Sequence, residues 1–157
     1  MAIVMHRART TADFETLWDL LTEYEADLPP DLRHGSVPDS TALKRTYVKR
    51  SAAFVAAAEG RIIGCVAVAE LDAETAVMMR LFVRPANRGM GAARVLVNAT
   101  MRFARRCGYG RMVLDTDKER LRAAYCLYRS LGFTECEPYA SVEYACPTFM
   151  ERRVHLV

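Results

Sequence analysis

The sequence predicts a mixed α/β fold in which helices pack on a mostly antiparallel sheet. Three observations support this fold class. Apolar residues recur at helical spacing early in the chain and again after residue 89, whereas residues 53–83 form successive β-like runs separated by short turns. The chain has 157 residues, 52% of them hydrophobic and 26% charged, which suits one compact core. We therefore expect a single domain over residues 1–157.

The amino-terminal part predicts a strand followed by a helix. Residues Ile3–Arg9 alternate weakly between apolar and polar, as a strand does. Thr10 or Thr11 can then cap a helix that carries Asp13 in its first turn and ends before Pro29. The apolar face of this helix consists of Phe14, Leu17, Trp18, Leu21 and Tyr24. An apolar stripe of this kind usually belongs to a core.

The middle of the chain predicts a loop, a short helix and three antiparallel strands. Residues 28–39 contain several proline and glycine positions and predict a loop that could cover a substrate site. A short helix is expected over residues 40–49. Three β-like runs follow, the first two joined by the turn Glu59-Gly60. These runs are Ala53–Ala58, Arg61–Glu70 and Thr75–Val83.

The carboxyl-terminal half predicts two helices and three strands. The longer helix runs from about Gly89 to Cys107, and Gly108 is placed to end it. Its inward face would use Ala93, Leu96, Val97, Thr100, Met101 and Ala104. The other predicted elements are a strand at Arg111–Thr116, a helix at Lys118–Leu131, and strands at Phe133–Glu137 and Thr148–Leu156.

The composition argues against a membrane protein and against a metal site. No apolar run approaches the ~18 residues of a membrane span, and the first residues lack the pattern of a signal peptide. We therefore expect a cytoplasmic protein with no membrane partner. The five cysteines form no Cys-x-x-Cys pair and the three histidines lie far apart, so no bound metal is expected.

The charge is mildly basic, with a net charge of +3 from 22 basic and 19 acidic residues. This balance does not favour a nucleic-acid partner. Binding of nucleic acid by the arginine-rich part of the chain is therefore only a third interpretation, after the two that follow. The arginines concerned could instead form a solvated helix face or a cationic rim around a small polyanionic ligand. They are Arg80, Arg84, Arg88, Arg94, Arg102, Arg105, Arg106 and Arg111.

The strongest functional pattern lies between Leu81 and Ala93. A strand ends, a proline turn follows, and a helix opens on Gly89 and Gly91. Helix amino termini carry unpaired N–H groups and a partial positive charge, so they bind phosphate oxygens. The glycines leave room for a pyrophosphate, and Arg88 adds a permanent cation. Alternatively, the glycines simply start a helix packed closely on the sheet. The pattern is neither a P-loop nor a dinucleotide fingerprint.

Two motifs carry a resemblance to a known family. The segment Val83-Arg84-Pro85-x-x-Arg88-Gly89-x-Gly91-x-Ala93 resembles the CoA-binding motif of the GNAT superfamily of N-acetyltransferases. The segment Ala124-x-x-x-Tyr128-Arg129-Ser130-Leu131-Gly132-Phe133 resembles its second signature, and residues 108–116 resemble its fifth strand. The tail around Glu137-Pro138-Tyr139 and Phe149-Met150-Glu151 is similar to a bacterial subgroup of uncharacterised members. The resemblance covers roughly residues 1–155.

The resemblance implies the GNAT fold and a site for acetyl-CoA. That fold has a mixed, mostly antiparallel central sheet of six to seven strands flanked by about four helices, with the fourth and fifth strands splayed beside a bulge. The backbone of Leu81, Phe82 and Val83 would pair with the pantetheine arm, and an N–H near Leu81 would polarise the thioester carbonyl. The pyrophosphate would be held by backbone amides of Arg88, Gly89, Met90, Gly91, Ala92 and Ala93.

The resemblance also implies the reaction. Acetyl-CoA would acetylate a primary amine of a small molecule or peptide by direct attack in a ternary complex, with Tyr128 as the general acid that protonates the departing CoA thiolate. An alternative role for Tyr128 is packing on the core. The alternative to an enzyme is a CoA-sensing or partner-binding module without catalysis. Dimers are common in the family, so a homodimer is one expected state.

The proton acceptor is not assigned by the resemblance. Val77 and Leu121 stand where members commonly have a glutamate and an asparagine, which puts retained catalysis in doubt. Arg80 could bind an acceptor carboxylate in the cleft, or it could be an ordinary strand residue at the surface. A water chain could replace the missing base. The nearby carboxylates, each also interpretable as a surface or turn residue, are Glu70, Glu74 and Asp115.

Overall fold

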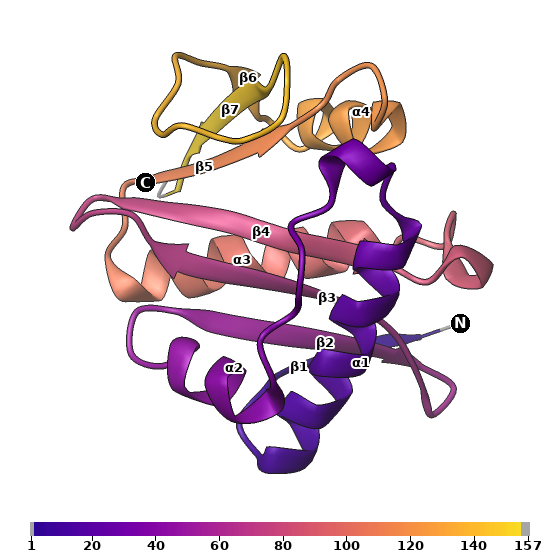
Figure 1. Ribbon diagram of the computed structural model, residues 1–157. Coiled ribbons are helices and arrows are strands. Elements are labelled where there is room, and N and C mark those ends of the chain that lie inside the picture. The colour runs from indigo at the N-terminus through magenta and orange to yellow at the C-terminus, as the bar shows by residue number, and fades with distance from the viewer. Residues whose placement is uncertain (1, 155–157) are drawn as a thin grey trace.

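The computed structural model describes residues 2–154, which form one twisted sheet with helices on both faces (Figure 1). The strands are β1 (Ile3–Arg7), β2 (Ala52–Ala58), β3 (Arg61–Glu70), β4 (Thr75–Val83), β5 (Arg111–Thr116), β6 (Thr134–Glu135) and β7 (Thr148–Arg153). The helices are α1 (Thr11–Asp27), α2 (Ser40–Thr46), α3 (Ala92–Cys107) and α4 (Arg122–Ser130), with 3₁₀ turns at Pro30–Leu32 and Pro85–Asn87. The predicted mixed α/β architecture is confirmed.

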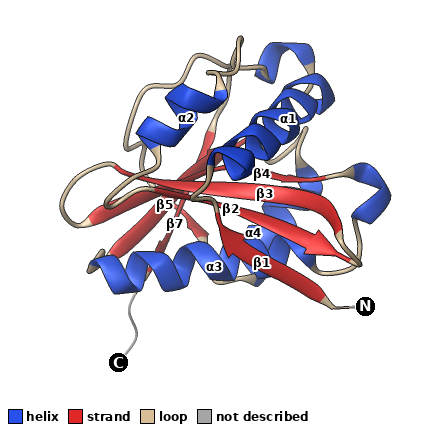
Figure 2. Cartoon of the chain, turned by 90° about the horizontal axis from the view of Figure 1, so that it is seen from below, coloured by secondary structure: helices blue, strands red, loops and turns tan. Residues whose placement is uncertain are grey.

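The sheet of the described residues has seven strands in the order β1-β2-β3-β4-β5-β7-β6. Every neighbouring pair is antiparallel except β4 and β5, which are parallel. Helices α1 and α2 cover one face and α3 covers the other, as Figure 2 shows from below. Tyr125 and Tyr128 of α4 share a buried cluster with α3, so α4 packs on the same face as α3.

Each face of the sheet buries its own apolar cluster. Phe14 and Leu17 of α1 pack with Phe82 on one face. Leu96 of α3 packs with Met112 on the other. Side chains alternate between the two faces along each strand, which is why one strand supplies both clusters. The central strands are therefore apolar on both sides, and only their ends and turns remain available for a polar site.

The fourth and fifth strands separate after a short stretch of pairing. Their paired residues are Thr75 with Arg111, Ala76 with Met112, and Val77 with Val113. Beyond Val77 the two strands diverge, so the carboxyl-terminal half of β4 has a free edge. The predicted splay of the fourth and fifth strands is confirmed.

A β-bulge lies beside the splay. On β3, Cys65 and Ala67 pair with Phe82 and Met79, so β4 has one extra residue in this interval. Arg80 occupies the bulge with a φ of 59°. The Cys65 thiol lies 3.6 Å from the Arg80 carbonyl oxygen, to which it donates. Burial raises the pKa of Cys65 to about 12, so the thiol keeps the proton that it donates to the bulge.

Two helices begin later than the sequence predicted. Helix α3 begins at Ala92 rather than Gly89, because Gly89 and Gly91 have φ values of 82° and 90°, outside the range of a right-handed helix. Helix α4 begins at Arg122 rather than Lys118. The carboxylate of Asp117 accepts the N–H groups of the two residues after Lys118, at 3.0 and 2.9 Å, and holds them in a turn.

Other boundaries differ by smaller amounts. The helix predicted over residues 40–49 ends at Thr46, and β6 is confined to Thr134–Glu135. The first strand ends at Arg7. The last strand ends at Arg153, and the final part of the predicted strand lies outside the described residues. Trp18 is 40% exposed and does not belong to the core that its helical spacing suggested.

Candidate active site

The splay between β4 and β5 opens into a cavity of about 640 Å³. Its walls come from the second half of β4, the start of α3, the end of β5, α4 and the end of α1. The volume lies within the usual range for small-molecule sites, about 300–1,000 Å³. The predicted site residues that line it are Leu81, Phe82, Val83, Arg88, Gly89, Gly91, Ala92, Ala93 and Tyr128. Met90 does not line it, and its side chain packs against the core.

The amino terminus of α3 faces this cavity without a side-chain cap. Gly91 is the N-cap residue, with a φ of 90°, and it offers no side chain to the first N–H groups. The first hydrogen bond of the helix runs from the Val95 N–H to the Gly91 carbonyl at 3.1 Å. The N–H groups of Ala92, Ala93 and Arg94 precede this bond and are not used by the helix itself. This end of α3 therefore fits an anionic group such as a phosphate.

The glycines at this helix start are required by backbone conformation rather than by packing. A Cβ atom added to Gly89 or Gly91 would meet no atom within 4 Å. Both residues have positive φ values, which residues other than glycine rarely adopt. The space in front of the turn is therefore open to a ligand, and the close-packing interpretation of the two glycines does not hold in this structure.

Arg88 is engaged with protein groups beside the turn. Its Nε donates to the carbonyl oxygen of Val83 at 2.9 Å. Its Nη2 forms an ion pair with Asp27 of α1 at 2.8 Å. The guanidinium thus ties the turn before α3 to the end of α1, and part of its charge is already compensated. Binding of pyrophosphate by the Arg88 backbone stays a prediction.

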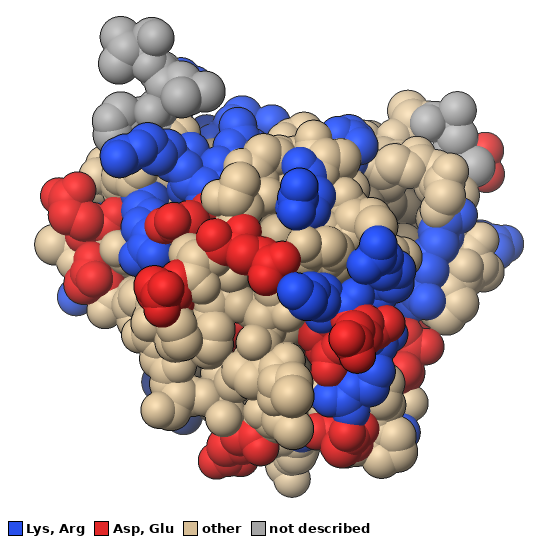
Figure 3. All heavy atoms as spheres, turned by 90° about the horizontal axis from the view of Figure 1, so that it is seen from above, with Lys and Arg blue, Asp and Glu red and all other residues tan. Residues whose placement is uncertain are grey.

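The arginine-rich segment divides into separate groups. Arg80, Arg88 and Arg94 line the large cavity. Arg84 is paired with Glu23 at 2.7 Å. Arg111 is likewise paired, with Glu151 at 2.6 Å. Basic and acidic side chains are interspersed on the face seen in Figure 3. The arginines are therefore neither one solvated helix face nor one continuous basic surface.

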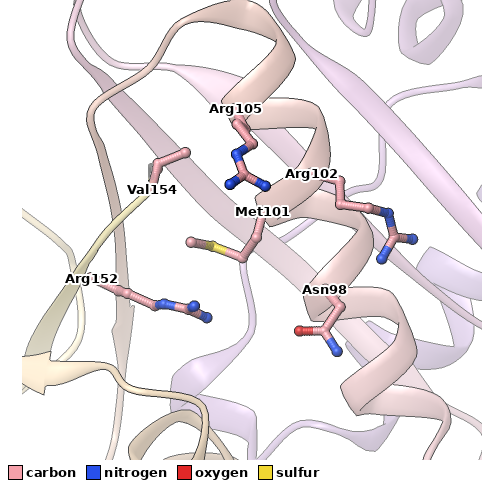
Figure 4. A pocket seen from close by; sticks show the side chains of 6 residues that line it. All are labelled: Asn98, Met101, Arg102, Arg105, Arg152 and Val154. Atoms are coloured by element: carbon pink, nitrogen blue, oxygen red, sulfur yellow. The ribbon is translucent and has the colours of Figure 1, made fainter. Parts of the chain in front are cut away.

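A second, smaller cavity of about 190 Å³ lies between α3 and the end of β7 (Figure 4). The guanidinium groups of Arg105 and Arg152 point toward the space beside Met101. The remaining lining residues are Asn98, Arg102 and Val154. This cavity shares no lining residue with the large one, so these arginines form no part of the candidate site.

Tyr128 both packs on the core and reaches the large cavity. It is 8% exposed, and its ring packs against Phe133 with ring centroids 6.0 Å apart. Burial, followed by the nearby Tyr24 and Asp115, raises its pKa above the usual value for a tyrosine. The hydroxyl therefore stays protonated at neutral pH and can donate a proton or a hydrogen bond. The catalytic role of Tyr128 remains a prediction.

The three candidate carboxylates lie in different parts of the structure. Glu70 ends β3 and lies 3.9 Å from Arg50, and Glu74 lies in the turn before β4. Neither lines the large cavity, whereas Asp115 at the end of β5 does. Val77 forms the last residue pair between β4 and β5, and Leu121 lines the cavity.

Several residues of the site were missed by sequence reasoning. Arg120, in the turn before α4, and Arg122, the first residue of α4, line the large cavity in a segment that was predicted as continuous helix. Tyr139 and Tyr144 donate hydrogen bonds to Asp115 at 3.0 and 2.7 Å. The resemblance of the tail around Tyr139 was a signal for the first of these tyrosines, and no sequence pattern pointed to Tyr144.

The loop predicted to cover a substrate site does border the cavity. Leu28 lines the cavity wall. Asp31 forms an ion pair with Arg120, which joins this loop to the turn before α4. His34 stacks on Tyr24 with ring centroids 6.1 Å apart, and its Nδ1 lies 2.9 Å from Glu25. These contacts hold the segment between α1 and α2 next to the site.

Within residues 2–154, no helix combines the length and apolar character needed to cross a membrane. In the same part of the chain, no group of three or more His, Cys, Asp or Glu side chains is placed so that it could bind a metal ion.

Known proteins resemble this chain in sequence and in fold. The sequence model of the Acetyltransferase (GNAT) family matches residues 14–133. An uncharacterized N-acetyltransferase of Schizosaccharomyces pombe is 34% identical over 131 residues, 81% of this chain and 80% of that protein. Human N-acetyltransferase 8B is 34% identical over 102 residues, 60% of this chain and 44% of the human protein.

The fold comparison agrees with the sequence comparison. A Salmonella typhimurium protein whose structure was solved with its cofactor acetyl-CoA has a TM-score of 0.80 and 22% identity, covering 99% of this chain and 95% of that one. The fold is thus the GNAT fold that the sequence motifs implied. The match of the family model to most of the sequence shows that the chain belongs to the acetyltransferase (GNAT) family.

Proposed function

We propose that this protein is an N-acetyltransferase that moves the acetyl group of acetyl-CoA to a primary amine of a small molecule or peptide. One observation carries the proposal: the uncapped start of α3, the bulged edge of β4 and the hydroxyl-bearing side chain of Tyr128 meet at one cavity. Family membership and the acetyl-CoA bound in the Salmonella protein support the choice of donor.

The donor would be held mainly by backbone groups. The N–H groups of Ala92, Ala93 and Arg94 are free of the helix's own hydrogen bonds and suit the pyrophosphate. The edge of β4 over residues 81–83 has no pairing with β5, so it can pair with the amides of a pantetheine arm. Arg94 and Arg122 add cationic side chains to the same cavity.

The acyl transfer needs an electrophile, a proton donor and a proton acceptor. A backbone N–H at the bulge, near Leu81, can donate to the thioester oxygen as negative charge develops there. Tyr128 can protonate the CoA sulfur as the carbon–sulfur bond breaks, because burial keeps its phenol protonated. The amine would attack directly while both substrates are bound, and no protein nucleophile is required.

A second candidate function is a CoA-sensing or partner-binding module without catalysis. Val77 and Leu121 motivate it, because both are apolar at positions where the family resemblance led us to expect polar side chains. Such a module would bind acetyl-CoA at the same site as the enzyme but would not catalyse acyl transfer.

The test is a thiol-release screen with acetyl-CoA and pooled primary amines, repeated with Tyr128→Phe. The enzyme proposal predicts amine-dependent release of CoA by the wild type and a loss of roughly 100-fold or more in kcat for the variant. Binding of acetyl-CoA without turnover of any pool would favour the sensing module. Failure of the wild type to bind acetyl-CoA in calorimetry would exclude both functions.

A further inference from the structure

Asp115 lies where the cavity widens beyond the paired part of β4 and β5. It is two residues past Val113, the last residue of β5 that pairs with β4. Met112 and Leu114 of the same strand point into the core that contains α3 and α4. Since side chains alternate along a strand, Asp115 points to the opposite face, on which α1 packs. The carboxylate therefore lines the cavity on the side opposite the start of α3.

Two tyrosines from the segment before β7 hold this carboxylate. The Tyr139 hydroxyl donates to Oδ1 at 3.0 Å, and the Tyr144 hydroxyl donates to Oδ2 at 2.7 Å. The Tyr139 ring is itself fixed edge-on against Phe149, with centroids 5.1 Å apart. Burial and the adjacent Asp115 raise the pKa of both tyrosines, so both hydroxyls keep their protons and act as donors. Asp115 is thus oriented by neutral groups.

The carboxylate has no cationic partner within the described residues. None of their Lys, Arg or His nitrogens lies within 4.0 Å of it. Arg120, which lines the same cavity, is paired with Asp117 and Asp31. A carboxylate has about four positions for hydrogen-bond donors, and the tyrosines occupy two. The charged and titratable groups that line this cavity or contact Asp115 are Tyr24, Asp27, Arg80, Arg88, Arg94, Arg120, Arg122, Tyr128, Tyr139 and Tyr144.

We infer that Asp115 binds the ammonium group of the acceptor and takes the proton that the amine must lose before it attacks. The inference rests on the proposed function, because it assigns the missing proton acceptor of that reaction. A half-buried carboxylate oriented only by neutral donors suits a cation supplied by a ligand. Tyr128 lies across the same cavity, so the proton donor and the proton acceptor flank the space between them.

The protons balance in the following way. The ammonium gives one proton to Asp115, and the free amine forms the carbon–nitrogen bond. The carbon–sulfur bond breaks, its electron pair stays on sulfur, and sulfur takes the Tyr128 proton. The nitrogen then loses its second proton, which returns to Tyr128 through solvent. Asp115 releases the first proton to solvent, so each turnover yields one amide, one CoA thiol and one free proton.

Tyr139 and Tyr144 act as positioning residues for Asp115. Their hydroxyls fix the plane of the carboxylate while leaving its remaining lone pairs to the ammonium. Tyr144 also lies 3.2 Å from the Thr116 carbonyl oxygen, which ties it to the end of β5. Removing its hydroxyl in Tyr144→Phe is expected to raise KM for the amine several-fold while leaving KM for acetyl-CoA unchanged.

The test measures binding of a cationic probe and of its uncharged analogue. Phenethylamine and 2-phenylethanol suit the wall formed by Tyr24, Leu28 and Met79. Each is titrated by NMR into the full chain saturated with desulfo-CoA, which cannot transfer an acetyl group. Asp115→Asn is expected to weaken phenethylamine binding about 10- to 100-fold, with little change for 2-phenylethanol. Glu74→Gln, which alters a carboxylate outside the cavity, is the matched control and should bind both probes as the wild type does.

Folding of the variants is checked by calorimetry with acetyl-CoA, whose affinity should be unchanged in Asp115→Asn. Equal affinity of wild type and Asp115→Asn for phenethylamine, including no binding by either, would overturn the inference. That result would leave the proposed function standing if acetyl-CoA still binds. With the best amine from the thiol-release screen, Asp115→Asn should also lower kcat/KM by roughly 100-fold.

Discussion

The two long helices of this protein, α1 and α3, begin in opposite ways. At the start of α1, the Thr10 side chain accepts the Asp13 N–H at 3.1 Å. The Asp13 carboxylate in turn accepts the N–H groups of Arg9 and Thr10, at 2.9 and 3.0 Å. At the start of α3, Gly91 provides no side chain, and the first N–H groups face a cavity.

The difference shows how one physical problem receives two solutions. Every helix begins with N–H groups that lack a partner within the helix. In α1 a capping box satisfies donors with the protein's own side chains, which stabilises the fold. In α3 the donors remain available to a ligand, and the local backbone requires glycine. Changes at the first terminus should therefore alter stability, and changes at the second should alter binding.

The largest expected effect comes from placing a carboxylate at the start of α3. Asn and Asp tolerate a positive φ better than most residues and have the same shape, so Gly91→Asn and Gly91→Asp differ mainly in charge. Gly91→Asp should weaken acetyl-CoA binding roughly 100-fold, because its carboxylate would occupy the position of the phosphate and repel the negative charge of the phosphate. Calorimetry measures both variants. A loss in Gly91→Asp no larger than in Gly91→Asn would show that this helix start does not bind an anion.

The next largest effect is on stability and arises at α1. Asp13→Ala removes the acceptor for two backbone N–H groups and should lower the free energy of unfolding by about 1–2 kcal/mol. Acetyl-CoA affinity should stay within about twofold of the wild type. Urea denaturation measures the first quantity and calorimetry the second. Glu15→Ala, at an exposed position outside the cap, serves as the control. A large loss of acetyl-CoA affinity in Asp13→Ala would contradict the assignment of stability to the start of α1 and of binding to the start of α3.

Acid titration of the same residue gives a related effect. Partial burial opposes the charged form of Asp13, but hydrogen bonds from the Arg9 and Thr10 backbone outweigh it and lower the pKa from 3.8 to about 2. Because the pKa is lower in the folded state, this stabilisation is present above pH 3.8 and is lost as the pH falls toward 2. The stability difference between wild type and Asp13→Asn should therefore shrink over that interval. A difference that is independent of pH there would contradict the assignment.

The smallest expected effect concerns a side chain at the rim of the donor site. Arg94 is exposed and lines the cavity, where its Nη2 lies 3.3 Å from Ser130. Arg94→Gln should weaken acetyl-CoA binding only about threefold at low salt, because exposed charge pairs contribute little. The loss should diminish as salt is raised. A loss as large as that of Gly91→Asp would mean that side chains rather than backbone amides dominate donor binding.

Local sequence signals predicted the parts of the site that depend on neighbouring residues. The sequence placed the cap of α1 at Thr10 or Thr11 with Asp13 in the first turn, and in the structure Thr10 is the N-cap residue. The glycine turn before α3 and the position of Tyr128 follow from two short motifs, and the structure brings both to one cavity. The start of α3 was wrong by three residues, because the φ values of the glycines cannot be read from helical periodicity.

The acceptor side of the cavity could not be predicted in the same way. Tyr144 reaches Asp115 from 29 positions away, through an irregular segment with no repeating pattern. The choice among Glu70, Glu74 and Asp115 depended on where β4 and β5 part, which is a property of strand register. Trp18 is a converse case, because its helical spacing predicted a core position and the neighbouring elements leave it 40% exposed.

The most direct test of the account follows the backbone amides of the two helix starts by NMR during a titration with acetyl-CoA. Saturable shifts are expected for the amides of Ala92, Ala93 and Arg94, whereas the amides of Thr10 and Asp13 should not move. Unchanged α3 amides at saturating acetyl-CoA would contradict the claim that the uncapped start of α3 binds the donor.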